Sequence, residues 1–208
     1  GIPEPSLLTV RCDVIRYPEF PHIEWTVTLQ NNGLQDTPII SQLRALDIAI
    51  ASAAGCNFTL RHNNGSPSAR DDYAPRDTPL PPGASLRIGT DDGRPSHRSL
   101  PYFNLDGGNR GLIVAVGWPG QWYASLSTDE SGRCQLVGGQ DDTHFVLHPG
   151  ESFRTPLIVL QPWRDDRQHA QNVWRRWMVA HNLPKVHGEP PKAQLLATSS
   201  GVYFEMVN

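Results

Sequence analysis

Two tryptophans and a glutamine at one turn are the residues whose types and spacing best fit ligand binding. Trp118, Gln121 and Trp122 stand in the segment Trp-Pro-Gly-Gln-Trp, directly after a continuous apolar run at 111–116. Flat indole rings cover the apolar face of a pyranose, and a carboxamide bonds its hydroxyls. The corner therefore indicates a saccharide site. The alternative is that both rings close the end of a hydrophobic core, because large aromatic side chains are mostly buried.

Three polar residues extend this predicted substrate-binding set. Arg94 and Ser96 lie in a turn that leads into the same stretch, and an arginine offers a rigid fork of donors for hydroxyl or carboxylate partners. His62 lies in the segment 61–83, which is poor in aliphatic residues, and such a loop within a compact domain is either functional or loosely ordered. A solvated loop without a ligand is the plainer interpretation of that segment.

The carboxylates do not form a recognisable catalytic pair. Asp-Asp pairs stand at 71–72, 91–92, 141–142 and 165–166. Neighbouring side chains of an extended chain point in opposite directions, whereas glycoside hydrolysis needs two carboxyls facing one another across a cleft. All four pairs fall at turns or at a helix start, where aspartate accepts hydrogen bonds from backbone N–H groups. We therefore expect no catalytic residue in this chain.

No motif points to a metal or a cofactor. The sequence has no GxSxG, HExxH, P-loop or GxGxxG segment. Its cysteines, Cys12, Cys56 and Cys134, are far apart and form no CxxC pair, which argues against zinc binding and dithiol redox chemistry. One disulfide with a free thiol, or three separate thiols, are both compatible with this count.

The elements that position these residues are short strands. Residues 23–29 alternate apolar and polar side chains, and 111–116 reads as a strand buried on both faces. Frequent Pro and Gly, at 19 and 18 residues, separate about ten such segments. This pattern predicts a mostly β fold, an antiparallel β-(super)sandwich with one C-terminal amphipathic helix.

That helix is expected over about 166–181. Its apolar residues recur at intervals of three and four and predict one buried face, made of Ala170, Val173, Trp174, Trp177, Met178 and His181. Pro184 ends the helix, and the proline-rich segment that follows reads as a linker. We expect a sandwich domain over 1–183, and at 184–208 a linker and the start of a following domain.

Charge and hydropathy exclude some partners. The net charge is −3 and no basic stripe is present, which argues against nucleic acid. No apolar run is long enough to span a bilayer, so no membrane insertion is expected. The sequence starts with Gly1 rather than Met, and its first residues alone predict no signal peptide. Both a secreted or periplasmic location and a cytoplasmic one stay open.

Four segments resemble a known family. The segments 17–38, 93–105, 107–122 and 153–184 are similar, in the same order, to the N-terminal β-sandwich domain of the α-galactosidase-like enzymes of glycoside hydrolase family 36. Pro95 departs from the family, which tends to carry a small polar residue there. The chain is also short before Gly93, so any oligomer contacts made by extra strands of the longer members are in doubt.

The resemblance implies a function for the chain. It would be the non-catalytic domain of a retaining enzyme that acts on a galactose-containing saccharide. A (β/α)8 barrel, fused to this chain or on another chain, would carry the catalytic aspartates. The resemblance also implies that copies of the chain form a homo-oligomer. Two other interpretations stay open: a free-standing carbohydrate-binding module or lectin, and a structural interaction domain with both tryptophans buried.

Overall fold

The structure, a computed structural model, describes residues 7–191. The chain divides into two compact units, Gly1–Gln171 and Asn172–Asn208, and the boundary falls inside the single α-helix. We describe each unit by itself. Residues 192–208, which hold most of the expected start of a following domain, lie outside the described residues.

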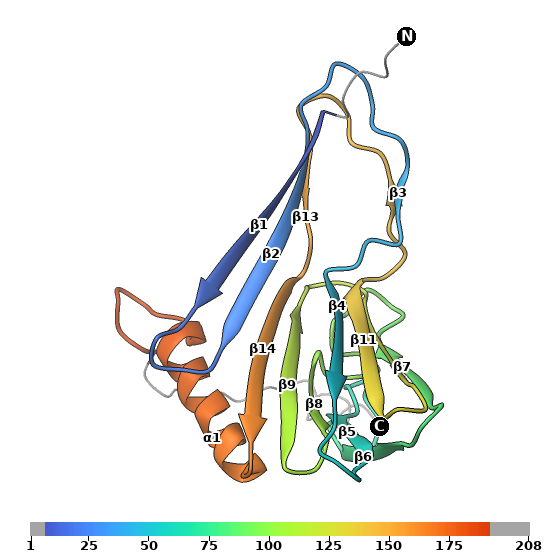
Figure 1. Cartoon of the computed structure of the whole chain (residues 1–208). Coiled ribbons are helices and arrows are strands. Elements are labelled where there is room, and N and C mark those ends of the chain that lie inside the picture. Colours follow the sequence, from blue (N-terminus) through green and yellow to red (C-terminus); the bar gives the residue numbers. More distant parts are fainter. Residues whose placement is uncertain (1–6, 192–208) are drawn as a thin grey trace, which may run out of the picture. The chain divides into compact units, whose positions relative to one another are not determined.

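An eight-stranded antiparallel sheet forms the larger layer of the first unit. Its order is β1-β2-β14-β9-β8-β5-β6, and β13 pairs along β2 (Figure 1). The strands are β1 (Leu8–Arg16), β2 (Ile23–Asn31), β5 (Phe58–Asn63), β6 (Pro75–Leu80), β8 (Tyr102–Asp106), β9 (Arg110–Gly117), β13 (Ser152–Arg154) and β14 (Leu157–Arg164).

A four-stranded antiparallel sheet of order β4-β11-β10-β7 forms the second layer. It comprises β4 (Leu46–Ala51), β7 (Ser85–Gly89), β10 (Trp122–Thr128) and β11 (Arg133–Gln140), and a small sheet pairs β3 (Ile40–Ser41) with β12 (His144–Phe145). One apolar cluster joins the two layers, with Phe103 and Val114 from the larger sheet and Leu126 and Leu136 from the smaller. The predicted mostly β sandwich is confirmed.

The apolar run at 111–116 is the centre of the larger sheet. β9 lies between β14 and β8, and Ile113 and Val114, which point to opposite faces, are both fully buried. Its hairpin with β8 turns at residues 107–109, between Asp106 and Arg110. Gly108 adopts a φ of +95°, and the Gly107 N–H donates to the Arg110 carbonyl over 2.8 Å. A left-handed residue at this point is accessible to glycine at little cost.

The loop predicted over 61–83 is wrong in part. β5 continues to Asn63, and β6 occupies Pro75–Leu80, so the irregular parts are 64–74 and 81–83. The two prolines of β6, Pro75 and Pro79, made this strand unrecognisable because proline cannot donate to a ladder. The structure places β6 at the edge of the sheet, where a strand needs donors on one side only.

Helix α1 runs over Arg167–Trp177 and continues as a π-helical turn at Met178–Asn182. Ala170, Val173, Trp174 and Trp177 are buried as predicted. The expected inclusion of Met178 and His181 in this face is wrong, because Met178 is 41% exposed and His181 is exposed as well. The change from α- to π-helical winding rotates the residues after Trp177 out of the 3.6-residue register.

The sheet anchors the first half of this helix. Asp166 accepts a hydrogen bond from the His169 N–H over 3.0 Å, as an N-cap does. Gln161 of β14, which is 1% exposed, donates from Nε2 to the Ala170 carbonyl over 2.9 Å. A buried amide that bonds a helical carbonyl fixes the start of α1 relative to β14.

All three cysteines are free thiols. Cys134 is buried on β11, and burial raises the pKa of its thiol to about 11. This thiol therefore packs as a small apolar side chain. Cys12 and Cys56 are exposed.

Candidate functional site

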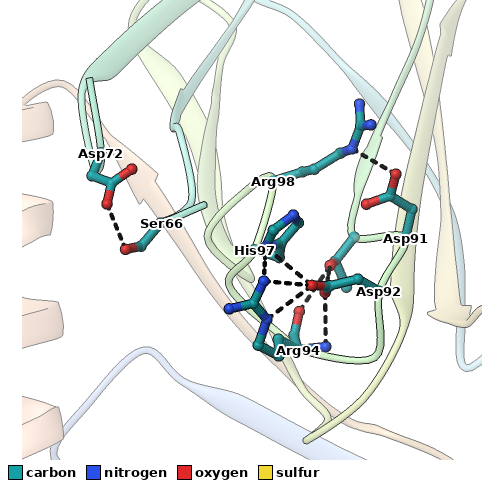
Figure 2. A network of polar contacts seen from close by, with 8 residues as sticks. Ser66, Asp72, Asp91, Asp92, Arg94, His97 and Arg98 are labelled. Carbon is teal, nitrogen blue, oxygen red and sulfur yellow. Dashed lines mark hydrogen bonds and ion pairs between the residues drawn. The ribbon is translucent and has the colours of Figure 1, made fainter. Parts of the chain in front are cut away.

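The loop at 90–98 is built around the Asp92 carboxylate. Asp92 Oδ1 accepts hydrogen bonds from the Arg94 N–H at 3.0 Å and from the Thr90 hydroxyl at 3.3 Å, while Oδ2 accepts from Arg94 Nε at 2.8 Å. Figure 2 shows the carboxylate surrounded by Arg94 and His97, with the ion pair of Asp91 and Arg98 beside them. A side chain that bonds the backbone two residues on forms an Asx turn, so Asp92 sets both the loop and the position of Arg94.

The Arg94 side chain is held in place but remains accessible. Its Nη2 lies 2.5 Å from His97 Nδ1 and 2.7 Å from Asp92 Oδ2, and the side chain is 63% exposed. Burial alone would raise the pKa of Asp92, but the hydrogen bonds and charge of Arg94 outweigh it and lower the pKa. Because Nε and Nη2 are engaged within the described chain, Nη1 is the nitrogen that faces outside partners. The arrangement suits binding of a hydroxyl or carboxylate oxygen.

The Trp-Pro-Gly-Gln-Trp corner closes against this loop. Trp122 is fully buried, and its Nε1 donates to the Pro95 carbonyl over 2.6 Å. Its own carbonyl accepts from the Thr90 N–H at 3.2 Å. Trp122 therefore offers no ring surface to a saccharide, because its indole joins the core to the 90–98 loop.

Trp118 and Gln121 are only partly buried, in contrast to Trp122. The Trp118 ring packs against the edge of the core, with its centroid 6.5 Å from that of Phe153. The Gln121 carbonyl accepts from the Asp141 N–H over 3.2 Å. The corner thus retains one indole and one amide that a ligand at the surface can reach.

A second loop, at 64–74, packs directly on the first. The Ser66 N–H donates to the Ser96 carbonyl over 2.7 Å, and Gly65 donates to the Arg98 carbonyl over 2.8 Å. Ser66 Oγ in turn bonds Asp72 Oδ2 over 2.7 Å (Figure 2). The backbones approach so closely that a Cβ on Gly65 would lie 2.1 Å from the Ser96 oxygen. Glycine is required at this contact.

We expect Gly65→Ala to separate the two loops. The added methyl group cannot fit between backbone atoms that hydrogen-bond one another, so the free energy of unfolding should fall by about 1–3 kcal/mol. Gly120→Ala is the matched control, since its Cβ would meet the Trp118 indole at 3.2 Å and no backbone atom nearer than the Gly93 oxygen at 4.0 Å. Chemical denaturation of both variants measures the effect. Equal stabilities would show that the contact between the loops does not matter.

His62 belongs to another part of the sheet. It lies on β5, opposite Arg76 of β6, and its Nε2 lies 3.1 Å from Thr78 Oγ1. Burial and the Arg76 charge lower the pKa of His62, so the ring is neutral at pH 7. The structure brings Arg94, Ser96, Trp118, Gln121 and Trp122 together, and it assigns His62 to the β5–β6 strand pair.

A groove of about 580 Å³ lies beside the corner on the outer face of the smaller sheet. Arg87 covers the ring of Tyr123, with Cζ 4.1 Å from the ring centroid, and Arg87 Nη2 lies 2.6 Å from Asp141 Oδ1. Gln140 Oε1 is buried there without a hydrogen-bond partner among residues 7–191. The groove combines polar side chains with the Tyr123 ring and with apolar residues such as Val137.

The Asp-Asp pairs cap backbone groups, as predicted. One carboxylate of each pair accepts from a nearby N–H: Asp72 from Ala69, Asp92 from Arg94, Asp141 from Asp142 and Asp166 from His169. Within the described part of the chain, no three His, Cys, Asp or Glu side chains gather as metal ligands. No helix among these residues is long and apolar enough to cross a bilayer.

Sequence reasoning missed Asp92, His97 and Gly65 as site residues. The Asp-Gly-Arg segment at 92–94 signals an Asx turn, but not which side chains that turn would gather. Gly65 follows Asn64 in an ordinary turn-like context, and its close approach to Ser96 depends on contacts between segments far apart in the sequence.

Comparison with solved structures identifies enzymes that share this fold. The α-galactosidase from Lactobacillus brevis matches over 84% of this chain and 24% of its own, with a TM-score of 0.72 and 14% identity. A GH36 α-galactosidase from Geobacillus stearothermophilus, in complex with 1-deoxygalactonojirimycin, matches over 82% of this chain and 24% of its own, with a TM-score of 0.66 and 17% identity. The same enzyme in complex with raffinose gives 0.65 and 18%, over 80% and 23%.

These similarities concern the fold. The chain spans about a quarter of the length of these α-galactosidases. No family model and no curated protein matches the sequence. The expected resemblance to the sandwich domain of family 36 enzymes is confirmed at the level of fold.

Proposed function

We propose that this chain is the non-catalytic N-terminal domain of an α-galactosidase-like retaining glycoside hydrolase. In this proposal it supports a (β/α)8 barrel that acts on a galactose-containing saccharide, and its loops flank the sugar site. The observation that carries the proposal is the structural match of most of this chain to about a quarter of several α-galactosidases. The rest of such an enzyme holds the chemistry.

The use of the carboxylates supports a non-catalytic role. Retaining hydrolysis needs a nucleophile and an acid/base whose carboxyl groups face one another about 5–5.5 Å apart. In this chain, one carboxylate of each Asp-Asp pair instead accepts a hydrogen bond from a neighbouring backbone N–H; these are Asp72, Asp92, Asp141 and Asp166. A carboxylate held in this way stabilises a turn and is poorly placed to attack a sugar carbon.

The position of the corner supports a flanking role. Trp122 begins β10 and Gly117 ends β9, so the corner and the 90–98 loop lie at one end of the sandwich. Loops at the end of a rigid scaffold commonly carry binding residues. Arg94 supplies an accessible, pre-oriented guanidinium there, and Trp118 a half-buried indole beside it. Both side chains suit a saccharide held by a neighbouring domain.

The groove on the outer face of the smaller sheet favours a second candidate function. A free-standing carbohydrate-binding module or lectin would bind sugar with the isolated chain, and Tyr123 with the amide of Gln140 provides suitable groups. Titration of raffinose into the isolated chain distinguishes the two. Binding that is lost in Tyr123→Ala would favour the module, whereas the domain proposal expects no measurable binding.

The flanking role predicts a kinetic effect in the complete enzyme. Arg94→Ala and Trp118→Ala should each lower kcat/KM for an aryl α-galactoside about tenfold, since a lost charged hydrogen bond or ring contact costs about 1.5 kcal/mol. The thermal midpoint of Arg94→Ala should barely change, because the Arg94–Asp92 ion pair is exposed.

Arg133→Ala is the matched control for these variants. Arg133 is an exposed arginine at the start of β11. It lies away from the corner, because Trp122 pairs with Gln140 at the opposite end of that strand. Its kcat/KM should equal that of the unmodified enzyme. If Arg94→Ala and Trp118→Ala unfold the domain and spare the activity of the folded remainder, the corner is structural and the flanking role is wrong.

A further inference from the structure

β1 is an outer strand of the larger sheet with an open side. It pairs with β2 over all nine of its residues, from Leu8 opposite Asn31 to Arg16 opposite Ile23. Among residues 7–191 no strand pairs with its other side, and Figure 1 shows it at the margin of the sheet. Val10, Val14 and Ile15 are 61%, 52% and 52% exposed. The strand thus presents both a backbone edge and apolar side chains.

The ladder determines which backbone groups face outward. The Asn32 N–H donates to the Leu7 carbonyl over 2.9 Å, so Leu7 forms a hydrogen-bonded pair with β2. Such pairs alternate with non-bonded ones in an antiparallel ladder. The residues whose N–H and C=O groups point away from β2 are therefore the even-numbered ones, Leu8, Val10, Cys12, Val14 and Arg16.

The opposite edge of the same sheet is protected in a way that β1 is not. β6 carries Pro75 and Pro79, which remove two donors from that edge. Natural proteins use proline, bulges and charge to stop edge strands from pairing with other chains. β1 has no proline and a regular register. Its charged residues are Arg11 and Asp13 at the middle of the strand and Arg16 at its last position.

We propose that β1 pairs antiparallel with β1 of a second copy of this chain, about a twofold axis at Cys12. Cys12 then lies opposite the partner's Cys12, in a hydrogen-bonded pair. Val10 lies opposite the partner's Val14, and Arg11 opposite the partner's Asp13. The pairing joins two sheets edge to edge. It occupies the open side of β1 in both copies, so the assembly stops at a dimer. It does not depend on the proposed function.

Charge complementarity selects this register. Arg11 and Asp13 project from the same face of β1, with Arg11 Nε 3.0 Å from Asp13 Oδ2. With the axis at Cys12, Arg11 lies opposite the partner's Asp13, and Asp13 lies opposite the partner's Arg11. Each charge then has neighbours of opposite sign, both along its own strand and across the pair. Moving the axis to Val10 would place Arg11 opposite the partner's Thr9, and moving it to Val14 would place Asp13 opposite the partner's Ile15. Both alternatives lose the cross-strand ion pairs.

A charge swap tests the pairing on the 208-residue chain. Light scattering coupled to size exclusion should give a mass twice the 23.1 kDa of one chain. Arg11→Asp, and separately Asp13→Arg, place like charges opposite one another at two positions. Each should raise the dimer dissociation constant about tenfold or more. The double variant Arg11→Asp/Asp13→Arg restores opposite signs and should dimerise like the unmodified chain.

Mixing the two single variants sharpens the test, because their charges complement one another in a heterodimer. We expect the mixture to dimerise where each variant alone does not. The thermal midpoints should stay equal, since Arg11 and Asp13 are 69% and 53% exposed. A monomeric unmodified chain at its highest soluble concentration would overturn the proposal, and so would single variants that dimerise as well as the unmodified chain.

Oxidation at the axis provides an independent readout. Paired residues of a hydrogen-bonded site have Cα atoms about 5.5 Å apart, within the range of a disulfide. Diamide, which takes up two electrons and two protons from two thiols, should link the two Cys12 side chains into a covalent dimer on a non-reducing gel. The band should vanish in Cys12→Ser and persist in Cys56→Ser, which removes the other exposed thiol. A band that requires Cys56 instead would contradict the pairing.

Discussion

Replacing Trp122 by alanine is expected to lower the free energy of unfolding by about 3–5 kcal/mol, the cost of truncating a large aromatic side chain in a packed core. The ring is fully buried and its Nε1 donates to the Pro95 carbonyl. The change therefore opens a cavity and also releases the 90–98 loop that carries Arg94. Chemical denaturation measures the loss.

Trp122→Phe separates the two contributions. Phenylalanine retains an aromatic ring but not the N–H, so the loss should be smaller than for alanine and should come mainly from the Pro95 carbonyl left without its donor. Trp118→Ala is the second control, because that ring is only partly buried. If Trp122→Ala were no less stable than Trp118→Ala, the corner would not be part of the core.

Trp177→Ala should cost a similar amount, about 3–5 kcal/mol, because the ring is 1% exposed. It packs on Trp174, with ring centroids 5.1 Å apart and planes at 53°. Met178→Ala is the matched control at the next residue, where the side chain is 41% exposed, and it should leave stability nearly unchanged. Thermal unfolding of the two variants gives the comparison. A midpoint for Trp177→Ala equal to that of Met178→Ala would show that this face of α1 is not packed.

The elements with strong local periodicity could be predicted from the sequence. The alternation at 23–29 became β2, the apolar run at 111–116 became most of β9, and the three- and four-residue spacing from Ala170 to Trp177 became the buried face of α1. In each case the hydrophobic pattern indicates the type of element without long-range information. The pattern does not give every buried side chain, because Glu24 on the polar side of β2 is buried while Trp25 is only partly so.

The misses have physical reasons of a different kind. β6 forms a strand because it pairs with β5 at the edge of the sheet, where proline is tolerated. Its two prolines make the segment look unlike a strand in the sequence. For Trp122 the sequence left burial and sugar contact open. The ring is buried, and the Pro95 carbonyl, distant in sequence, accepts from its N–H inside the protein. The polar network of Asp92, Arg94 and His97 likewise depends on loop geometry that composition does not encode.

The corner and its two loops form a rigid support. The core and Trp122 hold the 90–98 loop, Asp92 orients Arg94 within it, and Gly65 lets the 64–74 loop pack against it. Such a scaffold can hold a guanidinium and an indole at fixed positions for another domain to use. Within the described residues, one carboxylate of each Asp-Asp pair accepts a hydrogen bond from a backbone N–H and so stabilises a turn or a helix start.

The direct test is the hydrolysis of p-nitrophenyl α-galactoside by the purified 208-residue chain. The account predicts no release of nitrophenol above the rate in buffer, because the proposed catalytic aspartates belong to a barrel outside this chain. Measurable turnover that is lost on changing one of its own carboxylates, such as Asp92→Asn, would contradict it. A variant that is folded by circular dichroism but inactive would then identify the catalytic residue.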